Sequence, residues 1–186
     1  MRKNGSNKSA CWQADTTYLK IQEGWCYLAT VMDLFSRRIL GWSVSNHNDS
    51  KLVCCALDNA VITRGNRLPN GLIHHSDRGS TYASNDYELK LKALGISQSM
   101  SAKGNCYDNA AMESFYGRYK TSSVNDTVFA DEQEARSNAF EYIETFYNRF
   151  RKHASLGYKN PIEFEQRFLP HISGEIASLP ACIENN

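Results

Sequence analysis

The sequence lacks any apolar run that approaches the ~20 residues needed to cross a membrane. Its first ten residues are polar and basic, and they contain no apolar segment of the kind that signal peptides carry. The six cysteines form no Cys-x-x-Cys pair and no cysteine and histidine spacing typical of zinc ligands. We therefore expect an intracellular protein with reduced, buried thiols, no zinc and no membrane partner.

An excess of charge of one sign is also missing. The chain carries 21 Lys and Arg against 20 Asp and Glu, a formal net charge of +1. Nucleic-acid-binding proteins usually show a basic excess, so this balance is weak evidence for such a function. A site built of carboxylates would offset basic residues elsewhere, and near-neutrality therefore does not exclude nucleic acid.

The chain has the length and composition of one globular domain. Its 186 residues are 41% hydrophobic and 22% charged, which is enough for a single core. Aromatic and β-branched segments separated by short polar turns predict an antiparallel meander of three strands, at 11–20, 25–33 and 37–45. We expect a flexible lead-in at 1–10, a folded core at 11–168 and an irregular tail at 169–186.

Helices and strands alternate after the meander. Apolar residues at helical spacing predict a helix at 51–65. The elements expected after it are a strand at 71–76, a helix at 82–93, a strand at 94–100, and helices at about 108–120, 131–152 and 161–168. The order βββαβαβα indicates an α/β fold with a mixed five-stranded sheet flanked by helices.

The stretch HHSDRGSTY, residues 74–82, places Asp77 at the end of a short apolar strand. An aspartate close to a glycine is ordinary turn chemistry, because its side chain can accept a hydrogen bond from the backbone of its own turn. For a lone aspartate at a strand end the turn is the better interpretation. A role in chemistry therefore depends on whether other acids lie nearby.

Two other acids lie in unusual surroundings. Asp15 lies inside an apolar strand, where an acid is costly unless it is exposed, paired or bound to a metal. Glu113 lies in a predicted helix beside the small residues Ala110 and Ala111, which leave room for another molecule to approach.

Three carboxylates from three elements are what a Mg²⁺ site for phosphoryl transfer requires. Hard divalent cations prefer carboxylate oxygen, and two of them ~3.5–4 Å apart can activate the attacking oxygen and stabilise the leaving one. General acid and base catalysis alone is the poorer explanation, since no histidine is tied to the acids. Of His74 and His75, we expect one to face the core and one the site, with a catalytic role disfavoured for both.

The acids belong to a series of segments that follow one another along the chain: WQADTTYL, VMDLFSRRILGW, HSDRGSTYAS, GNCYDNAAMESFYGRYK and YNRFRKHASLGYKNP. Together they resemble the catalytic core of bacterial insertion-sequence transposases of the retroviral-integrase superfamily, over roughly residues 11–168. That family carries an Asp, Asp, Glu triad with about 35 residues between the second and third acids, and here residues 78–112 separate Asp77 from Glu113.

The resemblance implies a ribonuclease-H-like fold, a Mg²⁺ or Mn²⁺ cofactor, and DNA cleavage with strand transfer during transposition. By matching motifs it implies that the catalytic residues and metal ligands are Asp15, Asp77 and Glu113. The attacking group would be water or a DNA 3′-hydroxyl. Productive complexes would be homo-oligomers on transposon ends and target DNA, in the bacterial cytoplasm at the nucleoid.

Two features depart from the family pattern. Members usually carry a helical DNA-recognition region before the core, whereas about ten residues precede the first strand here. We expect a truncated element, an excised domain, or a chain that relies on a second transposon-encoded DNA-recognition protein. Thr81 stands where related motifs often have glutamine. The alternatives are a ribonuclease-H-like nuclease without strand transfer and a catalytically silent DNA-binding or assembly domain.

Several residues near Glu113 are candidates for DNA contacts. At about 100° per residue, Asn109 and Lys120 share the helical face of Glu113, so Lys120 could contact a phosphate near the metals. A solvated lysine is nearly as good an explanation. Lys103 and Asn105 lie in the loop that enters this helix, and that loop either positions DNA or is a plain connector.

Three further interpretations concern residues outside the triad. Arg151 lies in the carboxyl-terminal family motif, where it either contacts DNA or holds the final helix to the core. Asp33 is the main rival for the metal site, although a structural role, holding its turn to Arg37 or Arg38, is favoured. The large aromatic residues are most simply core residues: Trp12, Trp25, Trp42, Phe115, Phe140 and Phe146.

Overall fold

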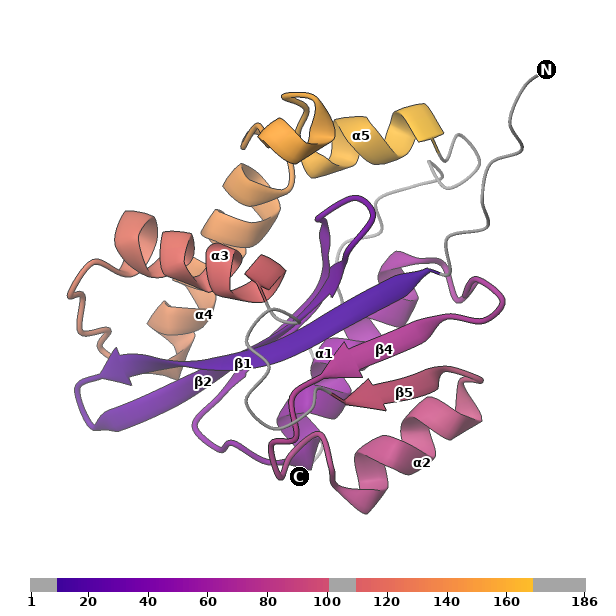
Figure 1. Cartoon of the computed structure of the whole chain (residues 1–186). Helices are drawn as coiled ribbons and strands as arrows, with labels where there is room; N and C mark the ends of the chain where they lie inside the picture. The colour runs from indigo at the N-terminus through magenta and orange to yellow at the C-terminus, as the bar shows by residue number, and fades with distance from the viewer. Residues whose placement is uncertain (1–9, 101–109, 169–186) are drawn as a thin grey trace.

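Five strands form one mixed sheet in the order β3-β2-β1-β4-β5, as the computed structural model of residues 10–100 and 110–168 shows (Figure 1). The antiparallel meander comprises β1 (Cys11–Ile21), β2 (Gly24–Asp33) and β3 (Ile39–Ser45). The parallel half comprises β4 (Ile73–Ser76), which pairs with β1, and β5 (Ser97–Met100), which pairs with β4. The predicted mixed five-stranded sheet is confirmed.

Helices cover both faces of this sheet (Figure 1). One face carries α1 (Ser50–Thr63) and α2 (Asn85–Ala93). The other carries α3 (Ala110–Tyr119), its π-helical continuation η2 (Lys120–Val124), α4 (Glu132–Phe140) and the π-helical η3 (Glu141–Tyr147). The chain continues through η4 (Ala154–Leu156) to α5 (Pro161–Phe168). Over the described ranges, no helix combines the length and apolar character needed to span a bilayer.

The helix ends follow local chemistry. The Asp49 side chain accepts the backbone N–H of Leu52 at 3.0 Å and so caps the start of α1. At α5, Asn160 accepts the N–H of Glu163 at 2.8 Å while the Glu163 carboxylate accepts the N–H of Asn160 at 3.1 Å. This reciprocal capping box, with Pro161 at the first helical position, fixes where the last helix begins.

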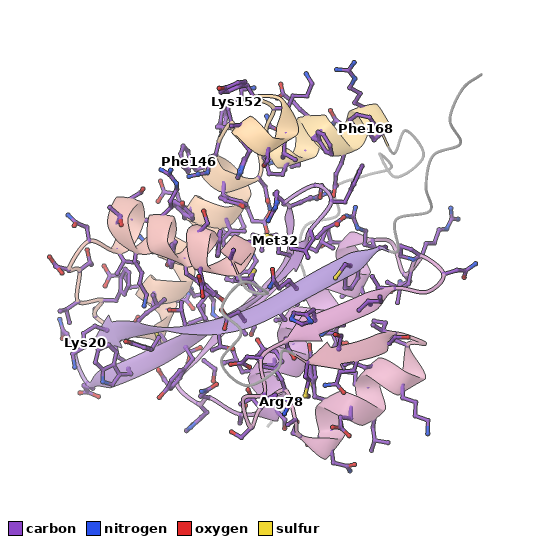
Figure 2. All side chains as sticks on the ribbon, in the orientation of Figure 1. Lys20, Met32, Arg78, Phe146, Lys152 and Phe168 are labelled. Carbon is purple, nitrogen blue, oxygen red and sulfur yellow. The ribbon has the colours of Figure 1, made fainter. Side chains whose placement is uncertain are left out.

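Two apolar cores lie on the two faces of the sheet. The core under α3 and α4 contains Leu28, Met32 and Phe115, and Met32 lies between the sheet and the helical layer (Figure 2). The core under α1 and α2 contains Trp12 and Tyr87. Alternation of side chains along β1 sends its successive residues into one core or the other.

The expectation that all the large aromatic residues are core residues is only partly correct. Trp12, Trp42 and Phe115 are buried. Trp25, Phe140 and Phe146 are 47%, 49% and 44% exposed, and Figure 2 shows Phe146 on the outer side of the helical layer. Each of the three is covered in part by another aromatic residue, Trp25 by Tyr18, Phe140 by Trp42 and Phe146 by Tyr142.

Candidate active site

The pairing of β1 with β4 sets the level of the two candidate aspartates. In this parallel ladder Cys11 pairs with Ile73 and Gln13 pairs with His75. Asp77 directly follows β4, and continuing the same offset brings it level with Asp15 on the neighbouring strand. Because side chains alternate along a strand, Asp15 belongs to the face that α3 covers, and a continuation of β4 by one residue would place Asp77 on the same face.

The buried hydroxyl of Tyr82 lies near both candidate aspartates. Its oxygen lies 3.0 Å from Oγ1 of Thr16, the neighbour of Asp15. Burial raises the pKa of Tyr82, and the negative charges of both Asp15 and Asp77 raise it further. A single hydroxyl therefore lies within electrostatic reach of both acids, and it remains protonated at neutral pH.

Local backbone contacts orient each aspartate. Asp15 Oδ1 accepts the N–H of Thr16 at 2.7 Å, and Asp77 Oδ1 accepts the N–H of Gly79 at 2.9 Å. A Cβ atom built on Gly79 would lie 3.0 Å from Asp77 Oδ1, closer than ordinary van der Waals contact. Because Gly79 has no side chain, the Asp77 carboxylate has room to occupy this position. In the sequence, Gly79 stands out only as the glycine of an ordinary turn directly after Asp77 and Arg78.

Helix α3 is tied to the sheet beside Asp15 by Tyr116, a residue for which no such role was predicted. The Tyr116 hydroxyl lies 2.7 Å from the carbonyl oxygen of Asp15 and 2.8 Å from Oγ1 of Thr30, the residue paired with Asp15 across the sheet. Glu113 lies one helical turn before Tyr116, so the two share a helix face. The Glu113 side chain is exposed, as is that of Asp77, whereas Asp15 is half-buried.

The donor set is suited to a hard divalent cation, since all three candidate ligands are carboxylates. Among residues 10–100 and 110–168, no three His, Cys, Asp or Glu side chains are close enough together to hold a metal ion. The structure thus places Asp15 on β1, Asp77 directly after the neighbouring β4 and Glu113 on the overlying helix without completing a cage. The acid triad stays a prediction at this level.

The histidines of the motif divide between the two faces of β4. His74 is fully buried, and its Nε2 lies 2.9 Å from the Tyr87 hydroxyl in the core under α2. Burial lowers its pKa to about 4, so the ring is neutral. His75 pairs with Gln13 and has its Nδ1 3.1 Å from Oγ of Ser99. The predicted core histidine is therefore His74.

Asp33 has the structural role that the sequence favoured. Its carboxylate accepts hydrogen bonds from the N–H of Phe35 at 2.9 Å and from Arg64 at 2.5 Å. The cation is thus Arg64, at the end of α1, rather than Arg37 or Arg38. Arg64 also contacts Glu165 of α5 at 2.6 Å, so this ion cluster joins three distant segments.

The candidate DNA-contacting residues fall in different places. Lys103, Asn105 and Asn109 lie outside the described residues. Lys120 has its Nζ 4.4 Å from the ring centroid of Tyr18, three residues along β1 from Asp15. Arg151 lies 5.7 Å from the ring centroid of Tyr147 and lines a cavity beside α3. Their contacts with DNA stay predictions.

Sequence comparison finds one family over most of the chain. Two family models described as "Integrase core domain" match residues 6–106 and 94–161. The chain is 44% identical over 158 residues to "Transposase InsF for insertion sequence IS3A" of Escherichia coli (strain K12), covering 85% of this chain and 54% of that protein. It is 45% identical over 157 residues to an "Insertion element IS600 uncharacterized 31 kDa protein" of Shigella sonnei, covering 84% and 57%. The chain thus spans about half the length of these curated relatives.

Solved structures of similar shape are retroviral integrases. The HTLV-2 integrase catalytic core domain in complex with magnesium has a TM-score of 0.62 and 18% identity, covering 83% of this chain and 94% of that one. A chain of the simian T-cell lymphotropic virus intasome has a TM-score of 0.67 and 18% identity, covering 92% and 57%. At this identity the likeness concerns the fold alone, and it confirms the predicted ribonuclease-H-like architecture.

Proposed function

The chain belongs to the integrase core domain family, and we propose that it is the catalytic core of an insertion-sequence transposase that cleaves DNA and joins DNA ends. The observation that carries the proposal is the register of β1 and β4, whose offset brings Asp77 level with Asp15. The two acids and an exposed glutamate on the helix tied to Asp15 are the donor set that metal-assisted phosphoryl transfer uses. We take residues 11–168 as the catalytic unit.

Asp15, Asp77 and Glu113 would hold the divalent cation, Mg²⁺ or Mn²⁺, and the magnesium complex of the HTLV-2 core supports this assignment. Such cations activate an attacking oxygen and stabilise a leaving one. The chain itself orients Asp77 through the Gly79 N–H and holds α3 over β1 through the Tyr116 hydroxyl. The attacking group is water in cleavage and a DNA 3′-hydroxyl in joining, so no covalent bond forms between protein and DNA.

DNA contacts and partners complete the proposal. Lys120 and Arg151, with Lys103, Asn105 and Asn109, would contact phosphates of transposon ends and target at the nucleoid. The chain would act as a homo-oligomer on DNA, as the intasome form of the simian virus relative supports. A second transposon-encoded protein would recognise the element ends.

Replacing Asp77 by asparagine tests the proposal, because it keeps the size of the side chain and removes the charge. We expect metal-dependent cutting of a labelled DNA duplex by the native chain and a loss of at least about a thousandfold in Asp77→Asn, since metal-assisted charge stabilisation contributes several kcal/mol. Asp86→Asn is the matched control, because Asp86 lies in the exposed first turn of α2 and accepts a hydrogen bond from Ser50. Equal cutting by the native chain and Asp77→Asn would contradict the assignment, and no cutting by any folded variant would favour a silent domain.

Gly79→Ala is expected to weaken cutting without unfolding the protein. The new methyl group would approach Asp77 Oδ1 to 3.0 Å, so the carboxylate must move by a few tenths of an ångström. We expect about a tenfold loss of cutting rate, equivalent to ~1.4 kcal/mol of transition-state stabilisation, and an unchanged midpoint of thermal unfolding. Both quantities are measured on the same preparation, and a native cutting rate in Gly79→Ala would show that Asp77 needs no such space.

A further inference from the structure

A cavity of about 220 Å³ lies beside the amino-terminal turn of α3, between that helix, the β2–β3 turn and the segment after η3. Its lining combines cationic and polar side chains with the apolar Ala110, Ala111 and Phe115, and no acidic residue of the described chain contributes to it. The charged and polar residues of the lining are Arg37, Ser114, Tyr147, Arg151, His153 and Ser155. A cavity of this composition is complementary to an anion.

Two side chains of the cavity lining each carry a buried nitrogen without a partner. Among the described residues, neither Nε of Arg151 nor Nε2 of His153 has a hydrogen-bond partner, although both atoms are buried. Buried polar atoms are normally paired, because leaving one unpaired costs its desolvation. Burial and the positive charges of Arg151 and Arg37 lower the pKa of His153 to about 4, so at neutral pH its ring is neutral.

The backbone presents the cavity's cations in fixed positions. Arg37 has a φ of 61°, a left-handed conformation that glycine or asparagine adopts more readily, and its N–H donates to the carbonyl oxygen of Asp33 at 2.7 Å. The Asn148 amide pairs with both the N–H and the carbonyl oxygen of Ile39 at 3.0 Å, so it acts as a further partner for the edge strand β3. This pairing anchors the segment that carries Arg151 and His153.

We propose that this cavity binds one phosphate group of the DNA backbone, with the guanidinium groups of Arg37 and Arg151 supplying charge and hydrogen bonds and the His153 ring lying beside the phosphate. The proposal rests on the proposed function, since it takes DNA as the ligand. Ser114 of the lining is the neighbour of Glu113 in α3. A phosphate held here would therefore fix the DNA within one helical turn of the third catalytic acid.

Inorganic phosphate tests the cavity without DNA, metal or catalysis. Titration into the native chain is expected to shift the ring resonances of His153 saturably, while the other described histidines stay unchanged. Arg151→Gln should abolish the shift, and Arg67→Gln, an equal charge change in the exposed loop before β4, should retain it. Absence of a saturable shift in the folded native chain would overturn the cavity as an anion site.

The salt dependence of binding to a DNA duplex tests the source of the phosphate. Losing one phosphate contact lowers the slope of log K against log salt by about one, and weakens binding about eightfold at 0.1 M salt. We expect this reduction in Arg151→Gln and in Arg37→Gln, but not in Arg67→Gln. If phosphate shifts the His153 resonances but the salt slope of DNA binding is unchanged in Arg151→Gln, the cavity binds free phosphate and the DNA assignment is overturned. A native chain that binds no DNA would overturn that assignment too. A reduced slope without a phosphate shift would place the arginines in a surface contact and overturn the cavity.

Neither measurement depends on cutting. Failure of the cavity therefore leaves the proposed transposase activity standing. Conversely, if the chain binds duplex DNA with the expected salt slopes but never cuts it, only the proposed function is contradicted and the cavity proposal stands.

Discussion

Arg64→Met is expected to lower the free energy of unfolding by about 3–5 kcal/mol, the loss typical of a buried ion pair that loses one partner. The Arg64 side chain is 4% exposed and lies between the carboxylates of Asp33 and Glu165, at 2.5 and 2.6 Å. Methionine keeps much of the volume but leaves two buried carboxylates facing each other. Arg38 remains on Glu165 at 2.8 Å and compensates one charge of the two.

Urea unfolding of native and variant chains measures this loss. Lys152→Met is the matched control, because its pair with Glu163 at 2.8 Å is exposed on both sides, with side chains 52% and 46% exposed. The control should leave the unfolding midpoint unchanged, since exposed ion pairs are screened by water. If both replacements shift the midpoint equally, the buried cluster does not hold α1, the β2–β3 turn and α5 together.

The pH dependence of the unfolding free energy of Arg64→Met tests the same prediction independently. In the native chain burial raises the pKa of Asp33, whereas Arg64 and Arg38 overcome the effect of burial on Glu165 and hold its pKa below the ordinary value. Without Arg64 both pKa values should lie above those of the unfolded chain. The folded variant then binds more protons than the unfolded one, so its stability should rise as pH falls from neutral toward about pH 5. The difference between native and variant chains should therefore shrink in acid.

Local sequence patterns were sufficient for the elements of the fold. The three β strands followed from short turns between β-branched and aromatic segments, and the helix at 51–65 from its apolar spacing. The expected helix 131–152 instead becomes α4 and the π-helical η3, and ends at Tyr147. Beyond it, the Asn148 amide pairs with Ile39, 109 residues away in the chain, and no local pattern encodes such a contact.

Local sequence patterns could not predict which aromatic side chains are exposed or which residue forms an ion pair with Asp33. Hydrophobicity alone says nothing of whether another element covers a residue, and Trp25 and Phe140 are accordingly half exposed. Asp33 was expected to pair within its own turn, yet its cation is Arg64, 31 residues on. The signal for Arg64 was faint, since a basic residue directly after an apolar helix is most often a solvated cap.

For the candidate site too, the sequence predicted some features and the structure was needed for others. Family resemblance selected Asp15, Asp77 and Glu113, and the spacing of the last two supported it. The alignment of Asp77 with Asp15 depends on which residues pair across the parallel ladder, which a single sequence does not state. The contact of Asp77 with the Gly79 N–H is the local turn hydrogen bond that the sequence already suggested, whereas the contact of Tyr116 with Asp15 joins residues 101 apart in the chain and emerged only from the structure.

Tyr116→Phe is expected to uncouple α3 from β1 beside Asp15. The hydroxyl donates to the carbonyl oxygen of Asp15 at 2.7 Å and can accept from the buried Thr30 hydroxyl at 2.8 Å. Phenylalanine fills the same space but leaves Thr30 Oγ1 without this partner, at a cost of about 1–3 kcal/mol in the free energy of unfolding. Glu113, one turn away, loses the anchor that fixes its distance from Asp15, so we also expect cutting to fall at least tenfold, or ~1.4 kcal/mol.

Tyr119→Phe separates the two effects. Tyr119 is fully buried in the same helix, and its hydroxyl donates to Oδ1 of Asn138 in α4 at 2.9 Å, away from β1. Its removal should also lower the free energy of unfolding, but by less than Tyr116→Phe, because Tyr119 has one such partner whereas Tyr116 contacts both Asp15 and Thr30. Cutting by Tyr119→Phe should stay near the native rate at a temperature where both variants are folded. Equal loss of cutting in the two variants would mean that general loosening of α3, and not its attachment at Asp15, governs the activity. A loss confined to Tyr116→Phe would instead show that the third acid is positioned by the carbonyl group of the first.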